Sequence, residues 1–175
     1  MGRELSRENL QGKLLDNLDF SNSRFVQSDL QRVVFRNSSI NNANLYQALL
    51  QEADLTNAQL VASDLIEANL SNAKLVSSNL RHSKLDGVNF DGADLTNADL
   101  KFATGYTAGQ LSEARSLYRT TGIHPNVAAE LRESHPDLFT PPPGFVVSDH
   151  TPTATFSFQR SVFGPIGSLF SRSKN

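Results

Sequence analysis

The sequence predicts an all-β solenoid, namely a quadrilateral β-helix of about five coils with a C-terminal α-helical cap and an irregular tail. The first observation behind this prediction is a large apolar residue, the centre of each unit, at every fifth position from Leu10 to Leu100. The second is a small residue two positions before most of these centres, as at Ala53. The third is Asp or Asn one position before many of them, as at Asp54. Together they describe one short unit repeated along about half of the chain.

A period of five fits neither of the regular secondary structures. On an α-helix each residue advances about 100°, so apolar residues five apart would wind around the whole helix surface. On a flat strand an odd step would send successive apolar side chains to opposite faces. The pattern is satisfied when the chain turns a corner at every unit, so that each centre points at one central axis. Four corners close a coil of about 20 residues, and coils stacked about 4.8 Å apart form a rod on the order of 24 Å long.

The residue types around each centre agree with a narrow tube. Each side of the tube has room for one large side chain, so the other inward-pointing residue must be small. Asp and Asn suit repeated turns because their side chains hydrogen-bond nearby backbone N–H groups. Proline, which lacks the donor that a stacked ladder needs, is absent from residues 10–104. The first coils differ, which predicts a wider, capped N-terminal end. The residues that break the pattern are Phe20, Phe25 and Phe35 at centres and Leu18 and Val33 at small positions.

The repeated unit, Ala-(Asp or Asn)-Leu-x-x, resembles that of the pentapeptide repeat family. Four units follow the family pattern closely: Ala53-Asp54-Leu55, Ala68-Asn69-Leu70, Ala93-Asp94-Leu95 and Ala98-Asp99-Leu100. The resemblance covers about half of the chain. It implies a right-handed coil, which the spacing alone leaves open.

We divide the chain into four segments. Residues 1–9 are a polar lead-in, 10–104 form the β-helix, 105–140 form a helical hairpin that caps it, and 141–175 form a tail rich in Pro, Ser, Thr and Phe. The open end of a stacked coil exposes apolar surface and unpaired strand edges, so a cover is expected there. Docking of a partner is the alternative role for the hairpin.

Two helices are predicted within the cap. Residues Thr107 to Gln110 have the sequence of a capping box, with a hydroxyl at the N-cap and Gln three residues later. The apolar residues that follow have helical spacing: Leu111, Ala114, Leu117 and Tyr118. Pro125 is expected to begin the second helix, and His135-Pro136 to end it.

Composition argues against several classes of function. The formal net charge is −2, so bulk attraction to nucleic acid or membranes is not favoured, and no direct nucleic-acid binding is expected. The chain has no cysteine, which removes disulfides, thiol catalysis and cysteine metal sites. No apolar run is long enough to span a membrane, and the N-terminus lacks the apolar segment of a signal peptide. We therefore expect a cytoplasmic protein.

No set of residues with catalytic, cofactor-binding or metal-binding spacing is recognisable. The four histidines are scattered and none has a partner at metal-ligand spacing: His82, His124, His135 and His150. The Asp residues recur with the repeat, so they follow the turns. The sequence contains neither a Gly-rich phosphate loop nor a nucleophile elbow. We expect no enzyme, no cofactor and no metal site.

One outward column of side chains indicates a contact surface. Residues 20 apart lie above one another, and the residue after each centre points outward. On three sides this column is mixed or polar, whereas the fourth contains Val26, Tyr46 and Ile66. A contiguous exposed apolar strip often marks a contact site, although these residue types also favour β-surfaces for packing reasons alone. We take Val26, Tyr46 and Ile66 as candidate partner-binding residues.

The tail after the proline run at 141–143 is unusually aromatic for an irregular segment. Four of its aromatic residues are further candidates for partner binding: Phe156, Phe158, Phe163 and Phe170. Three interpretations remain open. The tail folds back on the rod, anchors the protein to a partner or peripherally to a membrane, or is disordered.

The resulting hypothesis is a non-enzymatic protein-binding or scaffold protein, monomeric or weakly dimeric, with an unknown protein partner. One alternative is a purely structural module whose tail packs on the rod. The resemblance supplies another, because some family members mimic DNA and inhibit DNA gyrase. That role fits poorly, since Arg24, Lys74 and Lys84 interrupt any acidic surface, whereas a mimic of the phosphate backbone should carry one sign of charge.

Overall fold

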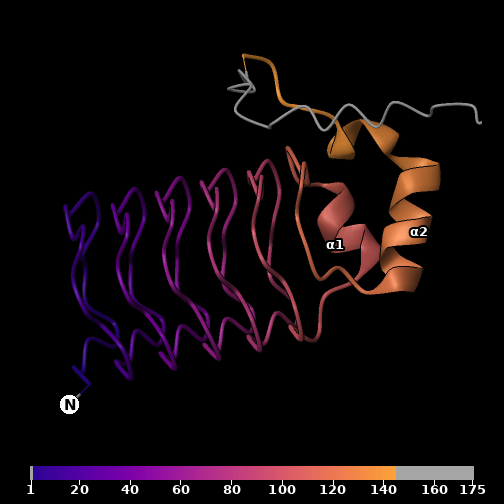
Figure 1. Ribbon diagram of the computed structural model, residues 1–175. Helices are drawn as coiled ribbons and strands as arrows, with labels where there is room; N and C mark the ends of the chain where they lie inside the picture. The colour runs from indigo at the N-terminus through magenta and orange to yellow at the C-terminus, as the bar shows by residue number, and fades with distance from the viewer. Residues whose placement is uncertain (1, 145–175) are drawn as a thin grey trace, which may run out of the picture. The chain divides into compact units, whose positions relative to one another are not determined.

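A ladder of parallel bridges joins residues that lie 20 positions apart. In the computed structural model, which describes residues 2–144, this series runs from the bridge between Glu4 and Arg24 to the bridge between Lys84 and Thr104. Bridging residues recur at every fifth position, so each coil has four sides. Five steps of 20 residues separate Glu4 from Thr104, and the coils stack one after another toward the helices (Figure 1).

The coils begin earlier than the sequence pattern indicates. The Leu5 N–H donates to Arg24 O at 2.8 Å, so residues expected to form a lead-in make the first side. The apolar series does extend back to Leu5, but Arg3 and Glu8 stand at the positions that later coils fill with small residues. Both side chains are exposed, because among residues 2–144 no coil precedes the first one. The small-residue rule therefore applies only where two coils enclose the position.

The interior of the rod is a continuous stack of apolar side chains. Every centre from Phe20 to Leu100 is buried, and so is every small position from Ser23 to Ala98. Most buried serines at small positions bond within their own turn, as Ser63 Oγ does when it donates to Leu60 O at 2.7 Å. Ser38 is an exception, because its Oγ donates to Leu15 O of the preceding coil at 2.7 Å. In both cases a hydrogen bond compensates for burial of the hydroxyl.

The N-terminal end is filled by an aromatic cluster. The ring centroids of Phe20, Phe25 and Phe35 lie 5.4–6.0 Å apart in tilted and edge-to-face arrangements. Val33 is buried beside them, whereas Leu18 is 41% exposed and Leu14 is 78% exposed. The rings thus fill the core at this end, whereas Leu18 remains partly exposed.

Each corner is a β-turn whose third residue has a left-handed backbone. The φ angle of this residue is 55° at Ala62 and 62° at Phe102, and similar values recur through the coils. A carbonyl-to-N–H bond across four residues with positive φ at the third position defines a type II turn. The predicted role of Asp and Asn before the centre is confirmed, because they accept the N–H two residues later. The Asp54 Oδ1 atom, for example, accepts the Thr56 N–H at 3.1 Å.

The regular coil breaks at Gly105 and is followed by helix α1, Ala108–Ser112. The predicted capping box is present, with the Thr107 side chain accepting the Gln110 N–H and the Gln110 side chain accepting the Thr107 N–H. The helix is only five residues long. It therefore ends before three of the four residues that the helical spacing assigned to it, namely Ala114, Leu117 and Tyr118.

The chain then re-enters the ladder. Ser116 bridges to Asp94 and Thr121 to Asp99, at a step of 22 residues instead of 20. Leu117, which was expected on a helix, is fully buried as a further centre, and the Leu95 N–H donates to Ser116 O at 3.0 Å. This segment pairs with the last coil and does not continue the helix, because pairing satisfies backbone donors and acceptors at the edge of that coil.

Two more short elements follow, helix α2, Pro125–Ser134, and the 3-10 helix η1, Pro136–Phe139. The expected start of α2 at Pro125 and its end before His135 are both confirmed. Leu131 and Leu138 are buried in the same core as the coils, and the Leu117 N–H donates to Leu138 O at 2.7 Å. A partial coil thus separates the two helices that were expected to form a simple hairpin. Within the described residues, none of the helices is long and apolar enough to cross a membrane.

Candidate functional site

The three apolar residues singled out from the sequence lie on one side of the rod. We call this side A; its centres in consecutive coils are Phe25, Leu45 and Leu65, each fully buried. Bridges between consecutive coils hold the neighbouring segments next to one another. Each of the three residues follows a centre and is half-buried, so part of each side chain is open to solvent. The set, which we call the side-A strip, is Val26, Tyr46 and Ile66.

A chain of side-chain hydrogen bonds borders the strip along the corner of side A. Arg7 Nε donates to Gln27 Oε1 at 3.3 Å, and Gln27 Nε2 donates to Gln47 Oε1 at 2.8 Å. Gln47 Nε2 then donates to Glu67 Oε2 at 2.7 Å. These four residues stand in equivalent positions of four consecutive coils, so one continuous ladder fixes the side chains next to the strip.

Ion pairs border the opposite edge of the strip. Arg24 Nε lies 3.1 Å from Glu4 Oε2, and Lys84 Nζ lies 3.9 Å from Asp64 Oδ2. Asn44 stands between them in the same column, and its Oδ1 accepts the Tyr46 N–H at 3.0 Å. The strip therefore has an apolar centre with a polar border on both edges, and the charges of that border alternate in sign.

A more buried ion pair lies on another side, at Asp54. Two guanidinium nitrogens of Arg36, Nε and Nη2, each lie 2.8 Å from Asp54 Oδ2, while Thr56 Oγ1 donates to Oδ1 at 2.6 Å. Burial raises the pKa of Asp54, but the hydrogen bonds from Thr56 and Arg36 outweigh it, and the pKa lies below its usual value. Both oxygens are occupied, so this carboxylate stabilises the fold and is not placed to bind a ligand or accept a proton from one.

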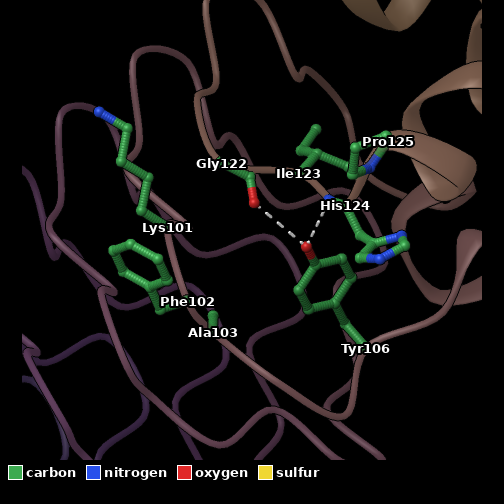
Figure 2. A pocket seen from close by; sticks show the side chains of 8 residues that line it. All are labelled: Lys101, Phe102, Ala103, Tyr106, Gly122, Ile123, His124 and Pro125. Carbon is green, nitrogen blue, oxygen red and sulfur yellow. Dashed lines mark hydrogen bonds between the residues drawn. The ribbon is translucent and has the colours of Figure 1, made fainter.

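A hollow lies where the last regular coil meets the start of α2. We call it the corner pocket; its volume is about 330 Å³. Figure 2 shows Phe102 and Tyr106 on either side of it, with Ile123 above. Tyr106 is held by two hydrogen bonds, since its hydroxyl accepts the His124 N–H at 2.8 Å and donates to Gly122 O at 3.3 Å. The pocket is lined by Lys101, Phe102, Ala103, Tyr106, Gly122, Ile123, His124 and Pro125.

The outer wall of the corner pocket is an exposed aromatic side chain. Phe102 is 65% exposed, although its ring stacks on His82 with centroids 4.9 Å apart. The Arg81 guanidinium carbon lies 5.6 Å from the centre of the same ring, at cation–π distance. A second hollow of about 390 Å³ shares Ala103, Tyr106 and His124 with the corner pocket.

The pentapeptide repeat model matches the chain with eight copies, over residues 14–51, 28–65, 43–81 and 73–104. These matches overlap and run without a gap from residue 14 to residue 104, which is more than half of the chain. The chain belongs to the pentapeptide repeat family. This confirms the family that the sequence resembles, and it implies a right-handed quadrilateral β-helix.

Solved structures of pentapeptide repeat proteins are similar to this chain. One from the cyanobacterium Cyanothece 51142 is 28% identical over 60% of this chain and 86% of its own, with a TM-score of 0.58. HetL from Nostoc sp. strain PCC 7120, involved in heterocyst differentiation regulation, is 31% identical, over 68% of this chain and 54% of its own, with a TM-score of 0.48. A protein of the Arabidopsis thaliana thylakoid lumen is 25% identical, over 64% and 76%, with a TM-score of 0.46. No curated protein matches this chain.

The pentapeptide pattern identified the side-A strip but missed the corner pocket. The pattern singles out the residue directly after each centre, which is half-buried in most units, whereas the next residue, at the left-handed corner, is the more exposed one in most of them. The residue type at this corner does distinguish Phe102 in the sequence. On the side that contains Phe102, the corner residues of the other coils are small or polar: Asn22, Asn42, Ala62 and His82.

Some predicted site residues cannot be placed on either surface. Phe156, Phe158, Phe163 and Phe170 lie outside the described residues. Within residues 2–144, no group of His, Asp or Glu side chains is arranged to hold a metal ion. Pentapeptide repeat proteins are generally structural or binding proteins, and the side-A strip and the corner pocket are the two surfaces of the described chain that we consider for binding.

Proposed function

We propose that this pentapeptide repeat protein is a non-enzymatic scaffold that binds a partner protein through side A. One observation carries the proposal: the side-A strip is apolar and half-exposed, and it is bordered on both edges by polar side chains that bond to one another. Protein interfaces have this arrangement, with an apolar centre inside a polar rim.

Rigidity supports the same proposal. Bridges to the coil before and to the coil after hold the backbone under the strip. The chain of side-chain hydrogen bonds from Arg7 to Glu67 restrains the side chains on one edge. A surface that is already ordered loses little conformational freedom when a partner binds. A regular rod thus offers a rigid surface without a separate folding step on binding.

The ends of the rod have a supporting role in this proposal. Segment 105–140 acts as its C-terminal cap, since Leu111, Leu117 and Leu131 are buried in the same core as the last coils. Because the cap covers this end of the rod, the sides are the surfaces that remain for a partner. The protein acts as a monomer or weak dimer in the cytoplasm, and its partner is another protein.

The DNA-mimic alternative has less support. A surface that imitates the phosphate backbone needs one sign of charge along its length. On side A, Arg24 and Lys84 alternate with Glu4 and Asp64, and on the side of Phe102 two cations, Arg81 and Lys101, are exposed or half-exposed. The purely structural alternative, with the tail packed on the rod, predicts that the side-A strip has no partner.

A matched pair of charge substitutions tests the proposal. Ile66→Arg places a cation in the side-A strip, and Val61→Arg places the same cation at the equivalent position of the next side; both residues are half-buried. Arginine is tolerated at such positions, because Arg36 and Arg81 already occupy two of them. We expect partners captured from a lysate of the source organism by the wild-type chain to be lost with Ile66→Arg and kept with Val61→Arg. Equal capture by all three proteins, with equal thermal stability, would contradict the assignment of side A.

A further inference from the structure

We propose that the corner pocket is a second binding site, for a peptide segment that inserts one large apolar side chain and carries carboxylates beside it. The site is separate from the side-A strip, so it does not depend on the function proposed above. The argument rests on the walls of the pocket, on how they are fixed, and on the charge at its rim.

The pocket walls fit an apolar side chain. Phe102, Ile123 and Pro125 contribute apolar surface, and the volume of about 330 Å³ falls in the range of ligand-binding clefts. A pentapeptide coil does not need an aromatic residue at the corner of a turn, where positive φ disfavours it. The ring stacks on His82 and yet remains 65% exposed, so a large part of it is open for contact with a ligand.

Among the polar side chains that line the pocket, the Tyr106 hydroxyl is already occupied, whereas the imidazole of His124 has no hydrogen-bond partner within residues 2–144. The Tyr106 hydroxyl both accepts from the His124 N–H and donates to Gly122 O (Figure 2). These bonds hold the ring against the start of α2, so the pocket exists before a ligand arrives. A small polar metabolite would find few free donors or acceptors here, whereas an apolar side chain needs none.

The rim of the pocket is cationic on the side of the last coil. Lys101 is exposed, and it takes part in no ion pair within the described residues. In Figure 2 its side chain runs away from Tyr106, so the ammonium group lies outside the hollow. Arg81 stands over Phe102 and is only loosely paired, at 3.5 Å, with Asp99. A carboxylate flanking the inserted side chain would meet Lys101 first and compete with Asp99 for Arg81.

An acid lies beside the neighbouring hollow. The side chain of Asp86 lies against Gly105, where an added Cβ would overlap it. Gly105 lines the neighbouring hollow and not the corner pocket. We therefore expect a bound peptide to place its carboxylates toward Lys101 and not toward the neighbouring hollow, which Asp86 adjoins through Gly105.

Peptide titration of the full chain tests the proposal. The probes are three fluorescein-labelled peptides: Glu-Asp-Phe-Glu-Asp, Glu-Asp-Ala-Glu-Asp and Lys-Lys-Phe-Lys-Lys. We expect fluorescence anisotropy to report binding of the first, with both others weaker by about tenfold or more. Added salt should weaken the first complex, since the rim contacts are exposed to solvent. Chemical-shift changes in two-dimensional NMR should centre on Phe102, Tyr106 and Ile123.

Two variants and one control locate the binding. Phe102→Asn introduces the residue type that occupies the equivalent corner of two other coils, at Asn22 and Asn42. The φ angle is positive there as well, so we expect the fold to be kept. We expect Phe102→Asn to weaken binding about tenfold or more and Lys101→Glu about three- to tenfold. Lys74→Glu makes the same charge change at an exposed lysine on another side and should have no effect.

Three results would overturn the proposal. One is equal affinity of wild type and Phe102→Asn for the acidic aromatic peptide, and another is no binding of that peptide at millimolar concentration. The third is a set of shifts at Tyr106 and Ile123 that follows protein concentration without any peptide, because this would assign the pocket to a second copy of the chain.

Discussion

Replacing Ala62 by Gly or Asn should stabilise the protein. Ala62 stands at the third position of a turn with φ of 55°, and it is the only alanine with positive φ in residues 2–144. The left-handed conformation costs a residue of this kind roughly 1–2 kcal/mol. Glycine removes that strain, but it also makes the unfolded chain more flexible, which lowers the free energy of unfolding by about 0.4–1 kcal/mol. The net gain should be about 0.5–1 kcal/mol for Gly and about 1 kcal/mol for Asn, which tolerates this conformation with a side chain.

Urea denaturation followed by circular dichroism measures this gain, and thermal unfolding should shift upward by about 2–4 °C per kcal/mol. The control is Ala58→Gly, on the same side and in the same coil. Ala58 is fully buried and its φ is not positive, so glycine there removes a buried methyl group and adds flexibility. We expect Ala58→Gly to destabilise by about 1 kcal/mol. A loss of stability in Ala62→Gly as large as in this control would refute the argument that turn conformation decides which residues suit the corners.

Two further changes probe the ion pair and the re-entry of the chain into the ladder. Asp54→Asn should cost about 1 kcal/mol near neutral pH, because charged hydrogen bonds from Arg36 and Thr56 are weakened. The pKa of Asp54 is lowered on folding, so this difference should persist above the usual aspartate pKa of about 3.9 and fade as pH falls through the folded-state pKa. Urea titrations across this range check it, and a difference that stays constant into strong acid would be inconsistent with it. Leu117→Ala should cost about 2–5 kcal/mol in thermal unfolding, as for any fully buried leucine, and a loss below about 1 kcal/mol would argue against a buried centre there.

The repeats could be predicted from the sequence because each residue type there has one clear physical reason. A centre such as Leu65 must be apolar because it is enclosed by coils, and Asp54 suits its place because its carboxylate accepts the Thr56 N–H. These requirements recur in every coil and reinforce one another. The same local rules did not identify the first side, because Arg3 and Glu8 have no preceding coil within the described chain to exclude them.

The C-terminal segment was harder to predict because two structures compete for the same pattern. Leu111, Ala114, Leu117 and Tyr118 have helical spacing, but Leu117 also stands where a further coil can use it as a centre. A break of two extra residues, which places Ser116 against Asp94, shifts the register, and periodicity alone does not reveal such a shift. The partial coil is favoured over a longer helix because it pairs with backbone groups that the last coil would otherwise leave unpaired. Those groups belong to the folded neighbour, so the sequence of the segment itself does not reveal them.

The candidate site was only partly predictable for a similar reason. Side-A residues could be aligned from the spacing of 20, but their degree of exposure depends on the turn. The left-handed corner turns the second residue after the centre toward solvent, and Phe102 gains its exposure in that way. The corner pocket additionally needs Ile123 and Pro125, which are brought there by the re-entry of the chain into the ladder.

The constant step of five residues has a consequence for how such a protein can diverge. Insertion or deletion of one unit between the side-A strip and Lys101 would leave every later contact within its own coil intact, because coils interact only with their neighbours. It would, however, rotate everything that follows by about a quarter turn around the axis. The angle around the axis between the corner pocket and the strip is therefore set by the number of pentapeptide units that lie between them. Evolution can reset the angle between two binding surfaces in discrete steps without redesigning either of them.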